Sequence, residues 1–175
     1  PDTHGHFMQI TTKYRNTVPG TYIALIADVV TRWNVTKEEL LNGTGIEQTK
    51  LLEPMWHADF DQTIHIIDRA LLLTKAQPFA FGFYLGMQMT ITCHGLMGMT
   101  AMLAGNIKQA LNIAQEFISL QSSIHKIKLE VFDDHAAILF EQTESYYLGE
   151  VIQIALLLGF AQMGKSISGQ ELSGY

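Results

Sequence analysis

Residues 125–132, HKIKLEVF, decide the fold class of this chain, because here the hydrophobic pattern changes from the period of a helix to that of a strand. Apolar side chains occupy every second position and charged side chains fill the positions between, which is typical of a half-buried strand. The polar residues Asp133-Asp134-His135 follow, and residues 136–140 predict a second strand. The two segments therefore predict an antiparallel hairpin.

Helical patterns dominate on both sides of this hairpin. Apolar residues recur three and four positions apart, and the pairs Thr36/Glu39 and Asp59/Gln62 have the spacing of capping boxes. The predicted helices cover residues 21–33, 36–43, 59–75, 78–86, 106–118 and 146–163, the last ending at Gly164. The expected fold is α+β, mostly helical, with a small antiparallel sheet formed late in the chain. We expect residues 19–175 to form one domain, after an N-terminal extension (1–18) that is poorly ordered or derived from cloning.

Composition excludes several classes of protein. The 175 residues are 47% hydrophobic and 16% charged, with a formal net charge of −6 and no cluster of Lys or Arg, so we expect no DNA contact by this chain itself. The single cysteine, Cys93, excludes an intrachain disulfide and fits a cytoplasmic protein. No apolar stretch reaches the length of about 20 residues that a membrane span needs.

Two segments partly match motifs that bind nucleic acids or nucleotides, but neither meets the requirements of its motif. The helices over 21–33 and 36–43 could form a helix-turn-helix, but Glu38 and Glu39 stand where a recognition helix would approach phosphates. Asn42-Gly43-Thr44-Gly45 lacks the Lys-Ser/Thr ending of a phosphate-binding loop. This Gly-rich segment is interpreted as a connector.

Catalytic and metal-binding alternatives depend on two histidine-containing groups. His57 and His65 are eight residues apart, but the cap at Asp59 places His57 outside the helix, and no standard zinc-binding motif is present. Cys93 and His94 are adjacent, so their side chains are expected to point apart, with a buried cysteine and a partly exposed histidine. A small enzyme or metal-binding protein remains the alternative function, without any cofactor being expected.

The segment between Phe79 and Phe117 offers a candidate ligand pocket as the functional alternative to core packing. Methionine and aromatic residues are frequent between Phe79 and Phe117, and flexible methionines suit adaptable apolar surfaces. Plain core packing would also explain this composition. The candidate effector-pocket residues are Phe83, Tyr84, Met87, Thr90, His94, Met97 and Phe117.

Four segments, in order and spacing, resemble a known family. They are LLNGTGI (40–46) with LEP (52–54), FGFYLG (81–86), HGLMGMTAM (94–102) and the helix from Asn106 to Phe117 containing Ala110-Leu111. Together they resemble the arabinose-binding-like N-terminal regulatory domain of AraC-type bacterial transcription regulators. Asn106-Ile107-Lys108-Gln109 departs from the usual Thr-Leu-x-Glu, and Glu116-Phe117 replaces a frequent basic residue.

The resemblance implies a non-enzymatic domain that binds a small effector, forms a homodimer and controls a C-terminal helix-turn-helix domain, which we expect to be absent from this chain. DNA would be contacted only through that other domain. The apolar residues of the candidate pocket favour an apolar or amphipathic effector over arabinose.

Overall fold

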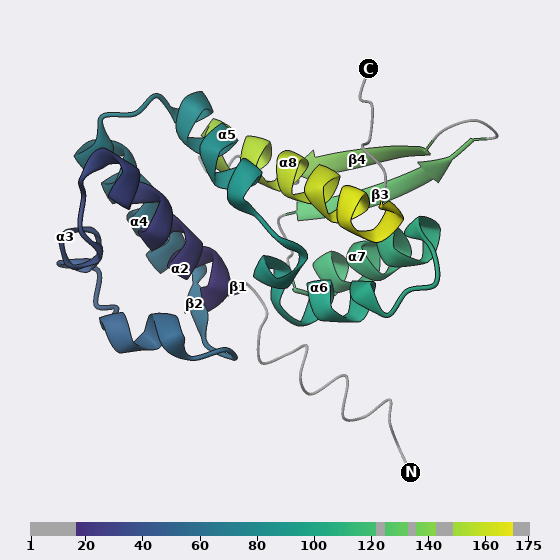
Figure 1. Cartoon of the computed structure of the whole chain (residues 1–175), viewed down its shortest axis with the longest axis horizontal. Coiled ribbons are helices and arrows are strands. Elements are labelled where there is room, and N and C mark those ends of the chain that lie inside the picture. The colour runs from purple at the N-terminus through teal and green to yellow at the C-terminus, as the bar shows by residue number, and fades with distance from the viewer. Residues whose placement is uncertain (1–16, 122–124, 133–135, 143–148, 170–175) are drawn as a thin grey trace, which may run out of the picture.

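The computed structural model describes residues 17–121, 125–132, 136–142 and 149–169, and these form two lobes (Figure 1). The first lobe contains β1 (Thr17–Pro19), α2 (Gly20–Val29), η1 (Val30–Trp33), α3 (Lys37–Leu41), η2 (Gln48–Leu52), β2 (His57–Asp59) and α4 (Phe60–Thr74). The second lobe contains η3 (Ile91–His94), α6 (Gly95–Met102), α7 (Ile107–Gln121), β3 (His125–Val131) and β4 (Ala136–Gln142). Two further helices, α5 (Pro78–Gln88) and α8 (Gly149–Ser168), run between the lobes. The predicted α+β class is confirmed.

Capping interactions fix the helix starts in the first lobe. The backbone N–H of Glu39 donates to the Thr36 hydroxyl, and that of Gln62 donates to the Asp59 carboxylate at 2.7 Å. In both boxes the third residue of the helix also bonds back to the capping backbone N–H. Both predicted capping boxes are therefore confirmed, and α4 ends at Thr74, close to its predicted end.

Long-range contacts hold this lobe together. Strand β1 pairs antiparallel with β2, with Val18 opposite Ala58, a pairing that the sequence pattern did not predict. The Arg69 guanidinium on α4 donates to the carbonyl oxygens of Leu40 and Glu39, so it satisfies acceptors at the end of α3. The first hydrophobic cluster, which includes the fully buried Ile23, lies between α2, α3, α4 and α5.

The second lobe contains the predicted hairpin. Strand β3 pairs antiparallel with β4, with Leu129 opposite Ile138, and the connecting residues 133–135 lie outside the described part of the chain. Helix α7 begins where the Asn106 side chain accepts from the backbone N–H of Gln109 at 2.9 Å. The second hydrophobic cluster includes Met97 of α6 and Phe160 of α8.

Helices α5 and α8 lie side by side and connect the two lobes (Figure 1). Their backbones approach closely at two glycines of α5. A Cβ atom on Gly82 would lie 2.7 Å from the Val151 carbonyl oxygen, and one on Gly86 would lie 2.9 Å from that of Ala155. A larger residue at either position would push α8 away.

The predicted end of the last helix was wrong. Helix α8 continues beyond the buried Gly164 to Ser168, and Gly169 has the left-handed φ of 66° that terminates it. The N–H of Gly169 donates to the carbonyl oxygen of Lys165 at 3.0 Å. Within the described ranges, no helix has both the length and the apolar character needed to cross a membrane.

Candidate functional site

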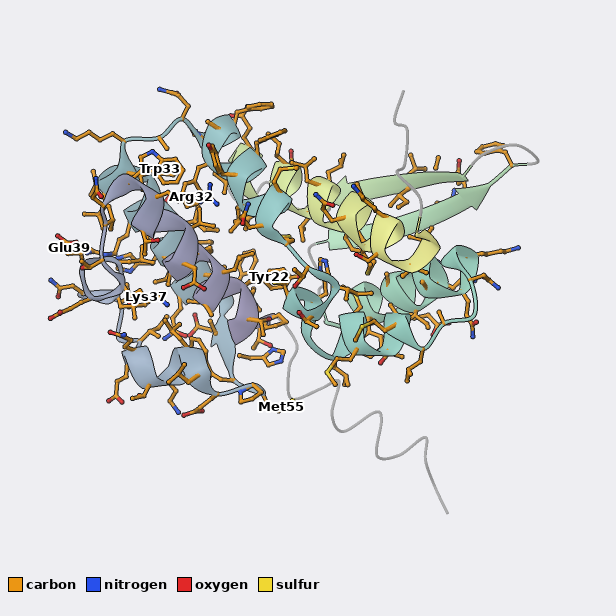
Figure 2. All side chains as sticks on the ribbon, in the orientation of Figure 1. Tyr22, Arg32, Trp33, Lys37, Glu39 and Met55 are labelled. Atoms are coloured by element: carbon orange, nitrogen blue, oxygen red, sulfur yellow. The ribbon has the colours of Figure 1, made fainter. Side chains whose placement is uncertain are left out.

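A buried polar pair joins the two lobes. Tyr22 lies on the first full turn of α2, and His94 is the last residue of η3. The Tyr22 hydroxyl and His94 Nδ1 are 2.5 Å apart, although 72 residues separate them in sequence. Figure 2 shows Tyr22 on the part of α2 that faces the second lobe. On its other side, the His94 ring stacks on Phe160 of α8, with centroids 5.6 Å apart.

Burial keeps both members of this pair neutral near pH 7. His94 is only 2% exposed, and desolvation lowers the pKa of its imidazole to about 4, while the backbone carbonyl of Gly159 partly counteracts this. Burial, helped by the nearby Cys93, raises the pKa of the Tyr22 hydroxyl. We assign the phenol as donor and Nδ1 as acceptor, which leaves the imidazole hydrogen on Nε2.

The second ring nitrogen of His94 lacks a well-formed partner. No described residue makes a hydrogen bond of normal geometry with Nε2, although this atom is buried. The Gly159 carbonyl is close enough to affect the pKa of His94 but does not meet that geometry. A buried donor without a good partner costs about 1–3 kcal/mol. His94 is therefore a buried polar side chain whose hydrogen-bonding capacity is only partly satisfied.

Close packing surrounds this point. The Thr21 hydroxyl donates to the carbonyl oxygen of Cys93 at 2.7 Å, a second link from α2 to η3. A Cβ atom on Gly159 would lie 2.5 Å from Met89 Sδ and 3.3 Å from His94 Cε1. Glycine at 159 therefore permits η3 to lie against α8.

The seven candidate pocket residues do not all converge. His94, Met97 and Phe117 belong to the same region, because the histidine stacks on Phe160 and all three pack in or against the second cluster. Thr90 lies just before η3. Its hydroxyl forms hydrogen bonds with the hydroxyl of Thr92 and, at a longer distance, with Cys93 Sγ.

The other three candidates lie on α5 with exposed side chains. The Phe83 ring stacks on Phe79, and the Tyr84 ring meets Trp33 edge-on at 5.5 Å. Met87 Sδ accepts from the Gln162 side chain of α8 at 3.6 Å. The interactions that these residues make are within α5, with η1 and with α8, and none of them reaches His94.

The expected burial of the Cys93-His94 pair was wrong. Cys93 is half-buried, whereas His94 is the buried member. Residues 91–94 form a tight 3-10 turn that turns the imidazole inward between Tyr22 and Phe160. Because Nδ1 of His94 bonds to Tyr22, the histidine is not oriented as a base for the Cys93 thiol.

The alternative metal site also receives no geometric support. His57 lies in β2, as the cap at Asp59 predicted, and its Nδ1 is 3.0 Å from the Thr17 hydroxyl; burial lowers the pKa of His57. His65 is exposed on α4. In the described part of the chain, no three His, Cys, Asp or Glu side chains are grouped in a way that could hold a metal ion.

Sequence patterns did not reveal Tyr22 or Phe160 as partners of His94. Tyr22 is adjacent to the buried Ile23 in an apolar helix, and nothing local distinguishes it from a packing residue. The signal that was available is the absence of charge around His94. Residues 76–107 contain no Asp, Glu, Lys or Arg. His94 is the one histidine in this otherwise uncharged segment.

Comparison with known proteins settles the family. Residues 35–173 match the family described as "Arabinose-binding domain of AraC transcription regulator, N-term". The chain belongs to this family. The match includes all four segments that carried the resemblance. The chain is a regulatory domain of the AraC type, as the sequence motifs predicted.

One curated relative is likewise a regulator. The chain is 25% identical over 136 residues to the ornithine utilization regulator of Pseudomonas aeruginosa. That alignment covers 75% of this chain but only 38% of the relative. This chain therefore corresponds to well under half of the length of that regulator.

Proposed function

We propose that this domain senses a small effector in the cytoplasm and, as a homodimer, controls a DNA-binding domain of the same regulator. Family membership supports a regulatory role, and the longer relative supports a larger intact protein. The net charge of −6 supports DNA contact through another domain. We propose no catalytic activity, because His94 bonds to Tyr22 and not to the Cys93 thiol, and burial raises the pKa of the Tyr22 hydroxyl, which keeps it protonated.

The effector site is proposed at the junction of the lobes, around Tyr22 and His94. The observation that carries this proposal is the buried His94 Nε2 without a well-formed hydrogen bond. An acceptor atom on a bound molecule would satisfy that donor and recover part of the cost of burying it. Met97 and Phe117 supply adjacent apolar surface.

The chemistry of the junction favours an apolar or amphipathic effector. Arabinose would need many hydrogen-bond partners, and ornithine would need side chains that balance its charges. The segment 76–107 provides no charged side chain, and the ring and thioether groups of Phe160 and Met89 border His94. An alkyl or aromatic molecule with one acceptor group fits this environment best.

Coupling to the rest of the regulator is proposed to act through the arrangement of the lobes. His94 contacts Tyr22 on α2 of the first lobe and Phe160 on α8, so it connects these two helices. A molecule that contacts His94 would have different affinities for closed and opened arrangements of these elements. Such a difference in affinity is what shifts a conformational equilibrium.

A thermal-shift screen tests this function. Octan-1-ol, acetophenone, L-arabinose and L-ornithine are added separately to the purified chain, each at about 1 mM. Octan-1-ol and acetophenone are uncharged and carry one acceptor oxygen each, so we expect one of them to raise the melting temperature, and arabinose and ornithine to leave it unchanged. A rise with arabinose or ornithine alone would contradict the proposed effector class. A stoichiometric metal ion in the purified protein would favour the metal-binding alternative.

A further inference from the structure

Helix α5 is apolar on all sides, but only two sides are covered within the described structure. Phe81 is fully buried and packs near Trp33 in the first cluster. Gly82 meets the backbone of α8 at Val151. The third side carries large residues that remain exposed: Phe79 (55%), Phe83 (44%) and Met87 (45%).

These three exposed residues form a regular stripe. They lie four residues apart, so they share one face of the helix, and the rings of Phe79 and Phe83 stack with centroids 6.4 Å apart. Gly82 and Gly86 of this helix face α8, whereas the rings of Phe79 and Phe83 remain exposed. A helix with apolar residues on every side is normally covered on every side.

The distribution of charged residues favours one kind of partner for this stripe. Helix α5 lies within residues 76–107, which contain no Asp, Glu, Lys or Arg, although the whole chain carries a net charge of −6. A basic partner would be attracted to the carboxylates elsewhere on the surface. Two copies of an acidic chain repel each other, and a helix without carboxylates of its own lets them meet without placing negative charges together, while the Arg32 guanidinium over the Tyr84 ring adds a positive charge beside it.

We infer that the α5 stripe, Phe79-Phe83-Met87, is the surface on which a second copy of this chain docks. A two-fold axis would place each stripe against the stripe of the other copy, since such an interface uses the same patch twice. An 11-residue helix is about 16 Å long, so the two stripes can lie against each other along their full length. This inference names the surface for the homodimer of the proposed function and rests on that part of it.

The test is self-association measured by sedimentation velocity from about 1 to about 100 μM, without any effector. Phe83→Glu would place a carboxylate at the centre of the interface on each copy, and we expect the dimer dissociation constant to rise about tenfold or more. The matched control is Leu72→Glu on α4, because Leu72 is 73% exposed and receives the same charge away from the stripe. The control is expected to dimerise like the unchanged chain.

Two outcomes would overturn the inference. An unchanged chain that stays monomeric over this range would remove both the dimer and its surface. A dimer that Phe83→Glu leaves intact, or that Leu72→Glu weakens equally, would remove the surface alone. Circular dichroism and thermal melting verify that each variant folds, and Phe79→Glu replaces Phe83→Glu if the latter does not. The effector screen is independent of all these results.

Discussion

The two hydrophobic clusters of this domain are built from different residues. The first is rich in β-branched and aliphatic side chains with very little exposed surface, such as Ile23, Val30 and Ile66. The described buried members of the second are methionine, alanine and phenylalanine, including Met97 and Ala114. Stiff branched side chains specify one packing arrangement, whereas methionine adapts to several. We interpret the first cluster as a rigid base and the second as the part that adjusts around an effector.

The largest expected effect is a truncation in the rigid cluster. Phe81→Ala should lower the free energy of unfolding by about 4 kcal/mol, because Phe81 is fully buried and its loss leaves a cavity between α2 and α5. Met163→Ala is a comparable truncation at a buried position of the second cluster, and it should cost only about 2 kcal/mol, because the flexible methionine neighbour can partly fill the space. Urea denaturation measures both. Similar costs for the two variants would break the comparison.

The next effect comes from the residue that joins the clusters. His94 has a folded-state pKa of about 4, below its ordinary value of 6.5, so the native state binds fewer protons than the unfolded state. The stability that neutral His94 permits is therefore complete above about pH 6.5 and declines as the pH falls toward 4. Between pH 7 and pH 5 we expect a loss of about 2 kcal/mol, measured by urea denaturation.

His94→Gln serves as the control for this pH dependence. Glutamine keeps a polar side chain but does not titrate, so most of the loss between pH 7 and pH 5 should disappear. The half-buried His57 also has a lowered pKa and should leave a smaller residual dependence of the same sign. An unchanged pH profile in His94→Gln would show that another group is responsible.

The smallest expected effects are those of the helix caps. Asp59→Ala at the start of α4 and Asn106→Ala at the start of α7 each remove one side-chain bond to a backbone N–H. Each should lower the free energy of unfolding by about 1 kcal/mol. Equal costs would show that the lobes differ in their cores and not in local helix stability. A negligible cost for Asn106→Ala alone would indicate that the second lobe unfolds separately.

Local patterns predicted most of the fold, and their failures share a physical cause. The cap at Asp59 and the alternation over residues 125–131 are encoded by neighbours in sequence, and both predictions were confirmed. The end of α8 was placed at Gly164 because a glycine inside a packed helix and one that terminates it look alike in sequence. The left-handed φ of Gly169 distinguishes them only in three dimensions.

The candidate site was predicted less completely, because its contacts are long-range. The tyrosine partner of His94 lies 72 residues away, and its aromatic neighbour Phe160 lies on the last helix. The cysteine of the Cys93-His94 pair was expected to be the buried member, but the sequence did not show that His94 is the one that faces inward. That choice depends on how η3 packs between α2 and α8.

The central claim is that an effector is recognised at the junction through His94. The most direct test is a titration at pH 7.5 with octan-1-ol, an uncharged amphipathic molecule with one acceptor oxygen, with the melting temperature recorded for the unchanged chain and for His94→Gln. We predict a concentration-dependent rise of several degrees in the unchanged chain and a clearly smaller rise in the variant. Equal rises in the two proteins, or no rise in either, would contradict the account.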